Sequence, residues 1–164
     1  NYNFENLKAA IATGLFFDVE LTDVVSAVEN YLPANNRSQI FKTNENTLIC
    51  DSYNANPTSM QSALESFSLM QAEHKMVILG DMLELGEKSG EEHIKLLNDI
   101  RSLNIERALL VGPEFQKACS KCGFKSFPDV NKLIEFLKKE PLKNRTILVK
   151  GSRGIGLEKI YPLF

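Results

Sequence analysis

The sequence has few of the features that mark disulfide-stabilised or membrane-spanning proteins. It holds three cysteines, Cys50, Cys119 and Cys122, among 164 residues, and their odd number and spacing match no disulfide framework. We therefore expect reduced thiols and a cytoplasmic location. No apolar run is long enough to cross a bilayer, and no signal peptide is recognisable. A membrane partner is therefore not expected.

A concentrated positive charge is also missing. The 19 Lys and Arg residues are outnumbered by 21 Asp and Glu residues, which gives a net charge of -2. Binding to nucleic acid depends on a dense basic surface that releases counterions, so nucleic acid is not an expected partner. The Cys119–Cys122 pair has no second pair of ligands at the spacing a zinc site needs, and we predict no metal site in these residues.

The common phosphate-binding motifs are absent as well. No Gly-x-x-x-x-Gly-Lys-Ser/Thr loop occurs anywhere in the chain. The glycine-rich stretch 151–156 has the order Gly-x-x-Gly-x-Gly and follows the last predicted strand, whereas the dinucleotide fingerprint opens a first strand–helix unit. The sequence therefore predicts neither of these two nucleotide sites.

What is present is an ordinary globular composition, with 43% hydrophobic and 24% charged residues. Apolar residues at helical spacing predict a helix from about residue 7 to 14 and another over 21–31, with Thr22 as its N-cap. The stretch 33–36 breaks this pattern. We expect residues 1–33 to be the tail of a preceding domain, residues 34–164 to form a second domain, and the chain to be part of a larger protein.

After residue 36, short apolar strands alternate with amphipathic helices, which predicts an α/β fold with a largely parallel sheet. We expect a Rossmann-like sheet with helices on both faces, and an antiparallel edge hairpin around the turn 44–46. Ser89 and Glu92 form a possible capping box, Pro113 begins a helix that runs to about Cys122, and Asp129 caps another helix. The predicted strands are 38–42, 47–51, 76–80, 108–112, 124–127 and 146–150.

Ligands of such sheets bind beyond the carboxyl ends of the strands, which here are followed by the polar loops 51–57, 81–88 and 151–156. In the first loop, the Asp51 carboxylate could accept two ribose hydroxyl groups, and Asn54 and Asn56 could face one cleft. The same residue types are also those of an ordinary capped turn. The sequence leaves these two interpretations equally open.

The second loop holds Asp81 and Glu84, which could form a paired-carboxylate or magnesium site. The favoured interpretation is that both are solvated acids, since acids are commonest on surfaces. His93 falls on an apolar helix face and is expected to be a packed residue rather than a base. In the third loop, glycines would let the backbone approach a ligand, and Arg153 could bind a carboxylate or phosphate.

Together these loops resemble one family. The segments DSYNANPTSM, ILGDMLELGEKSGEEH and LVKGSRG occur in this order and are similar to the C-terminal domain of the Mur ligases. The opening NYNFENLKAA is similar to the end of the central ATP-binding domain of that family. The Tyr-Asn-Ala-Asn-Pro stretch resembles the branch that adds D-Ala-D-Ala to UDP-MurNAc-tripeptide.

The resemblance implies an ATP-dependent amide ligase of peptidoglycan synthesis that works through an acyl phosphate, uses ATP and Mg²⁺, and is a cytoplasmic monomer. The P-loop, the magnesium ligands and a carbamylated lysine belong to the central domain of the family. The resemblance therefore implies no catalytic residue in this chain, no activity of the chain alone, and the missing N-terminal and central domains as its partners. The stretch 33–36 would be the hinge on which the C-terminal domain closes.

By position, the resemblance also implies binding roles. Tyr2 stands where the family often has His, in the turn that contacts adenine. The residues implied for the nucleotide are Asn3, Asn6, Arg37, Asp51, Tyr53 and Asn54. The residues implied for the incoming dipeptide are Asn54, Asn56, Pro57, Ser152 and Arg153.

Two other functions remain open at this point. One is a different Mur-like ligase, such as an enzyme that recycles murein peptides, although the Tyr-Asn-Ala-Asn-Pro stretch argues against it. The other is a non-catalytic α/β module that binds a nucleotide or an amino acid, because a fold does not fix a function.

Overall fold

The computed structural model describes residues 2–33, 35–103, 105–119 and 123–164, with side chains from residue 4 onward in the first range. The chain divides into two compact units, Asn1–Pro33 and Ala34–Phe164.

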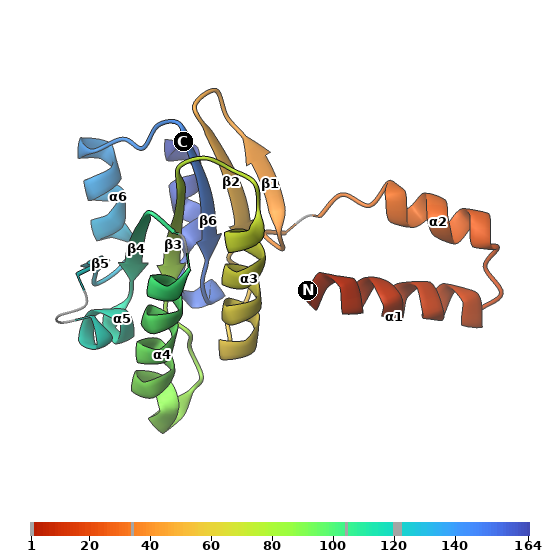
Figure 1. The fold of residues 1–164 in the computed structure, drawn as a ribbon, viewed down its shortest axis with the longest axis horizontal. Helices are drawn as coiled ribbons and strands as arrows, with labels where there is room; N and C mark the ends of the chain where they lie inside the picture. Colours follow the sequence, from red (N-terminus) through yellow and green to blue (C-terminus); the bar gives the residue numbers. More distant parts are fainter. Residues whose placement is uncertain (1, 34, 104, 120–122) are drawn as a thin grey trace. The chain divides into compact units, whose positions relative to one another are not determined.

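The first unit consists of helices α1 (Tyr2–Phe16) and α2 (Leu21–Glu29) (Figure 1). Gly14 lets them approach closely, since an added Cβ would lie 3.1 Å from Cγ2 of Val24. The expectation that Thr22 caps the second helix is wrong. The N-cap residue is Glu20, whose carbonyl accepts hydrogen bonds from the N–H groups of Asp23 and Val24, so the first turn begins two residues earlier.

The second unit is built on a six-stranded sheet with the order β1-β2-β6-β3-β4-β5 (Figure 1). β1 pairs with β2 antiparallel, and the other neighbouring strands are parallel. This confirms the predicted parallel sheet with an antiparallel edge hairpin. The strands are β1 (Gln39–Lys42), β2 (Asn46–Asp51), β3 (Lys75–Gly80), β4 (Arg107–Val111), β5 (Lys125–Phe127) and β6 (Arg145–Lys150).

Helices cover both faces of this sheet, as predicted, and each face has its own core (Figure 1). Helices α3 (Pro57–Leu69), α4 (Ser89–Ser102) and α5 (Pro113–Ala118) pack on one face. Helix α6 (Val130–Lys139) and the 3₁₀ segment η3 (Leu157–Leu163) pack on the other. Because successive strand residues point to opposite faces, an apolar strand such as β3 contributes to both cores.

Two helix ends differ from the predictions. The capping box at the start of α4 does not form: the N-cap residue is Lys88, and the Ser89 hydroxyl instead donates to Oε2 of Glu114 at 3.0 Å. Helix α5 ends at Ala118, earlier than expected. At the other predicted cap, the Asp129 carboxylate does accept hydrogen bonds from two N–H groups of α6.

The cysteines also differ in part from the expectation. Cys50 is buried and free, whereas Cys119 is disulfide-bonded, so the expectation of reduced thiols is wrong for Cys119. Cys122 lies outside the described residues. None of the helices in the described ranges is both long enough and apolar enough to cross a membrane.

Candidate functional site

The three polar loops begin at one edge of the sheet. Strands β2, β6 and β3 are neighbours, and Lys150 at the end of β6 is in register with Asp51 of β2 and Leu79 of β3. Parallel strands in register end at the same edge, so the loops 51–57, 81–88 and 151–156 start side by side. This edge is the candidate functional site of the second unit.

The carboxylate of Asp51 is almost completely buried and is held from two sides. Its Oδ2 lies 2.7 Å from Nζ of Lys150, and its Oδ1 accepts a hydrogen bond from the N–H of Ser38 at 3.2 Å. The Lys150 ammonium also donates to the carbonyl of Asn54 at 2.9 Å. The sequence patterns predicted no role for Lys150. The sequence feature that could have indicated a role is that Lys150, a charged residue, directly follows the apolar run of a predicted buried strand.

The rest of this loop is tied down at several points. The hydroxyl groups of Ser52 and Tyr161 lie 2.7 Å apart, and burial raises the pKa of Tyr161. The Asn56 side chain accepts a hydrogen bond from the N–H of Ser59 in a capping box, and Pro57 occupies the first turn of α3. Asn56 and Pro57 therefore have a local role in starting a helix.

The outward face of the loop carries an aromatic ring with two arginines. The guanidinium carbon of Arg37 lies 3.9 Å from the ring centroid of Tyr53, and that of Arg153, in the 3₁₀ segment η2 (Arg153–Ile155), lies 5.6 Å from it. The separation of the two guanidinium carbons therefore cannot exceed the sum of their distances from the ring centroid. Sequence reasoning named all three residues but did not predict that they meet. Guanidinium groups bind carboxylates and phosphates, so this arrangement suits an anion.

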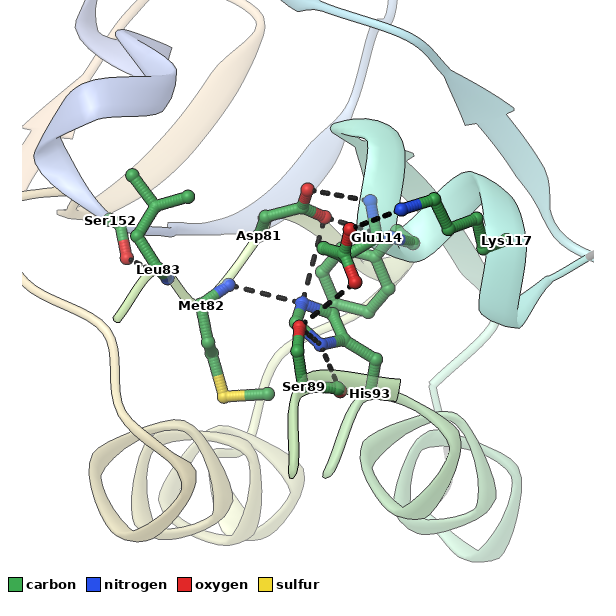
Figure 2. A network of polar contacts seen from close by, with 9 residues as sticks. Asp81, Met82, Leu83, Ser89, His93, Glu114, Lys117 and Ser152 are labelled. Carbon is green, nitrogen blue, oxygen red and sulfur yellow. Dashed lines mark hydrogen bonds and ion pairs between the residues drawn. The ribbon is translucent and has the colours of Figure 1, made fainter. Parts of the chain in front are cut away.

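The second loop has the predicted character only in part, since Glu84 is exposed as expected and Asp81 is not. Asp81 is completely buried, and its two carboxylate oxygens accept hydrogen bonds from the N–H groups of Glu114 and Phe115, both at 2.8 Å (Figure 2). It thus caps the N-terminus of α5 from outside the helix and is not a solvated acid. Burial raises the pKa of Asp81. Within the described residues, no group of three or more His, Cys, Asp or Glu side chains could hold a metal ion.

His93 lies next to Asp81 and is completely buried, as expected for a packed residue. Its Nε2 accepts a hydrogen bond from the N–H of Met82 at 3.1 Å, and its Nδ1 lies 2.7 Å from the carbonyl oxygen of Ser89 (Figure 2). A ring that accepts at Nε2 and donates at Nδ1 is a neutral imidazole. His93 therefore fixes the start of the second loop and has no free nitrogen for acid–base chemistry.

The third loop is bonded to the second. The Oγ of Ser152 accepts a hydrogen bond from the N–H of Leu83 at 2.9 Å, and the N–H of Ser152 donates to the Asp81 carbonyl at 3.1 Å. Gly151 makes the approach possible, because a Cβ there would lie only 2.8 Å from Cα of Gly80. The two loops therefore form one connected layer over the ends of β3 and β6.

The two asparagines predicted to contact adenine lie in the other unit. Asn6 is exposed on α1, and Asn3 belongs to the same helix, although its side chain is outside the described residues. The other residues predicted to bind the nucleotide or the dipeptide all belong to the second unit; they are Arg37, Asp51, Tyr53, Asn54, Asn56, Pro57, Ser152 and Arg153.

Comparisons with known proteins agree on one family. A family model described as the glutamate ligase domain of Mur ligases matches residues 36–153. The UDP-N-acetylmuramoyl-tripeptide–D-alanyl-D-alanine ligase of Treponema pallidum is 30% identical over 99% of this chain and 37% of its own length. The ligase of the same name from Rickettsia prowazekii is 36% identical over 78% of this chain and 29% of its own length.

Solved structures support the same assignment. The UDP-N-acetylmuramoylalanyl-D-glutamyl-2,6-diaminopimelate–D-alanyl-D-alanyl ligase of Acinetobacter baumannii matches with a TM-score of 0.85 and 31% identity. The match covers 99% of this chain and 36% of that structure. The chain thus spans little more than a third of the length of the relatives that it matches throughout.

Proposed function

This chain belongs to the Mur ligase family, and we propose that it is the C-terminal part of an ATP-dependent ligase that adds D-Ala-D-Ala to UDP-MurNAc-tripeptide in peptidoglycan synthesis. Two kinds of evidence support the proposal. The family model covers most of the chain, and curated relatives that match nearly all of it carry the name of this ligase. The Tyr53–Pro57 stretch favours this branch over other amide ligases.

The proposed reaction solves a leaving-group problem. A free carboxylate cannot be displaced by an amine, because oxide is a poor leaving group. Transfer of the ATP γ-phosphoryl group to the tripeptide carboxylate gives an acyl phosphate and ADP. The amine of D-Ala-D-Ala then attacks the carbonyl carbon, the C–O bond to phosphate breaks, and an amide and inorganic phosphate result. Such catalysis depends mainly on positioning and on stabilisation of charge.

The observation that carries the proposal for this chain is the contact of Arg37 and Arg153 with the Tyr53 ring. Both the nucleotide and the carboxylate end of the dipeptide are anionic. In the proposal, Arg37 binds the nucleotide, Arg153 binds the dipeptide carboxylate, and the Tyr53 ring contacts both guanidinium groups. Bidentate guanidinium contacts suit both groups.

The other residues of the edge have supporting roles in the proposal. Asp51 binds the ribose, while Asn54, Asn56 and Pro57 shape the loop that meets both substrates. The Ser152 hydroxyl accepts a hydrogen bond from a backbone N–H, so its own hydrogen can be donated to the dipeptide carboxylate.

Residues 1–33 would be the end of the central ATP-binding domain, where Asn3 and Asn6 contact adenine, and 33–36 would be the hinge. The described residues offer no cluster of metal ligands, and in the proposal the Mg²⁺ ligands belong to the missing central domain. The proposed enzyme is a cytoplasmic monomer, and this chain alone should release no ADP.

The test is ADP release by the full-length protein with UDP-MurNAc-tripeptide present and D-Ala-D-Ala added or withheld. Release that depends on D-Ala-D-Ala supports the proposal. Release with another amine only would retain a ligase and change the substrate. Absence of release with every amine, from a folded protein, would refute the proposal and favour a non-catalytic binding module.

A further inference from the structure

A buried ion pair at the carboxyl edge of the sheet includes a lysine to which the proposed function gives no role. Lys150 is 2% exposed and Asp51 is 7% exposed, and the distance from Nζ to Oδ2 is 2.7 Å. The two residues are in register on neighbouring parallel strands. Their side chains therefore project to the same face of the sheet.

Stability alone is a weak reason for such a pair. Removing an ammonium and a carboxylate from water is costly, and apolar side chains of similar volume often stabilise a protein as well or better. β6 reaches Lys150 through the buried apolar residues 147–149, so an apolar residue in place of Lys150 would continue an existing core. A better explanation for the buried pair is that it holds a neighbouring segment of the chain in place.

The ammonium of Lys150 spans the turn that follows β2. It bonds to the carboxylate at the start of the turn and, at 2.9 Å, to the carbonyl oxygen of Asn54 within it. The same Asp51 carboxylate accepts the N–H of Ser38. The Lys150–Asp51 pair thus connects three segments: β6 and the turn after β2 through the ammonium, and the segment that carries Arg37 through the carboxylate.

The turn held in this way presents two side chains outward. Ser52 is buried and lies within hydrogen-bond distance of the Tyr161 hydroxyl, and Asn56 caps α3. Between these fixed points, Tyr53 and Asn54 are exposed. The Tyr53 ring is the one that both guanidinium groups contact.

We propose that Lys150 is a positioning residue, whose ammonium fixes the turn 51–56 so that Tyr53 and Asn54 are held ready for the substrates. This inference rests on the proposed function for the identity of those substrates. Lys150 acts through Asp51 and the Asn54 carbonyl and has no assigned contact with a reacting atom. A preformed turn lowers the cost of ordering the loop when a ligand binds.

The first experiment uses this chain and needs no substrate. Hydrogen–deuterium exchange is measured for the peptides covering 51–56 and, as a reference, 76–80. Lys150→Met should raise exchange in 51–56 by roughly tenfold to a hundredfold, the range expected for a lost charge-assisted hydrogen bond, with a much smaller change in 76–80. Because the single variant removes the ammonium partner of a buried carboxylate, Asp51→Asn/Lys150→Met is measured as well and should also loosen the turn.

Lys143→Met is the matched control. Lys143 makes an ion pair with Glu45 at 2.8 Å, but both side chains are about half exposed. The same substitution there should leave exchange in 51–56 unchanged. Wild-type exchange of the turn in the folded double variant would overturn the proposal. So would loss of protection that is uniform across the sheet, which would indicate a purely structural pair.

The second experiment uses the full-length protein. The KM for D-Ala-D-Ala, measured at saturating ATP because Asp51 is also the proposed ribose ligand, should rise about tenfold in the double variant, in line with one lost charge-assisted bond, and should not change in Lys143→Met. An unchanged KM would overturn the role of Lys150 in positioning. If the wild-type protein shows no D-Ala-D-Ala-dependent ADP release, the proposed function fails, and the exchange experiment still decides whether Lys150 fixes the turn.

Discussion

Removing the carboxylate of Asp81 should destabilise the second unit far more than removing an exposed helix cap. Asp81 is completely buried, and both of its oxygens accept N–H groups of α5 at 2.8 Å. Hydrogen bonds to a charged group contribute about 1.5–3 kcal/mol each, and a buried donor left without a partner is costly. We therefore expect Asp81→Ala to lower the free energy of unfolding by about 3–5 kcal/mol.

The chain offers a matched control for this prediction. Asp129 accepts the N–H groups of two residues in the first turn of α6, at 2.8 and 3.0 Å, but it is exposed. Asp129→Ala should cost about 0.5–2 kcal/mol, the usual range for a helix N-cap. Both variants are measured by urea unfolding, with linear extrapolation to water. A cost for Asp81→Ala no larger than that for Asp129→Ala would refute the argument that the buried carboxylate holds α5.

The pH dependence of the same variant is a second check. Burial raises the pKa of Asp81, so the folded state binds a proton more tightly than the unfolded state. The stability that this provides is complete at acid pH and is lost as the pH rises through the folded-state pKa. The difference in unfolding free energy between wild type and Asp81→Ala should therefore be larger at about pH 4.5 than at about pH 7.5. A difference that grows with pH would contradict the assigned shift.

Three further predictions concern single positions. Gly112→Ala should lower the unfolding free energy by at least about 2 kcal/mol in the same urea assay, because φ there is +126° and a Cβ would lie 2.3 Å from the Asp81 carboxylate. An unchanged urea midpoint of unfolding would contradict this packing. Burial raises the pKa of Cys50 to about 11, so its thiol should resist alkylation at neutral pH in the folded chain and react once urea unfolds it. In the full-length protein, Tyr53→Leu should raise the KM for ATP or for D-Ala-D-Ala about two- to fivefold, as expected for the loss of an exposed cation–π contact. Tyr53→Phe keeps an aromatic ring and should leave both KM values unchanged. Equal KM values in the two variants would show that the ring does not contribute to binding.

Local sequence patterns were sufficient for most of the architecture. The apolar runs 76–80, 108–112 and 146–150 predict strands covered on both faces, and helices do cover both faces. Asp129 was predicted as an N-cap from its position immediately before an amphipathic helix, and its side chain does cap α6. These features depend on residues that are neighbours in the chain, which is why a pattern along the sequence can reveal them.

The errors at Ser89 and Asp81 concern residues whose partners are distant in the sequence. Ser89 was predicted to cap its own helix, yet its hydroxyl donates to Glu114. The N-cap residue of α5 is Gly112, which has no side chain to offer, and Asp81 supplies the cap from the end of β3. Reasoning from composition favoured a solvated Asp81, because acids are usually exposed. Only the packing of β3 beside β4 makes the buried position favourable.

The sequence by itself determined the alternation of strands and helices, the edge hairpin and the family of the chain, since these follow from periodicity and from short contiguous motifs. The tertiary structure decided the arrangement of the site. It placed Lys150 beside Asp51 and brought Arg37 and Arg153 to the Tyr53 ring. Such contacts depend on the strand order and register, which bring the carboxyl ends of β2 and β6 together across about a hundred residues of chain.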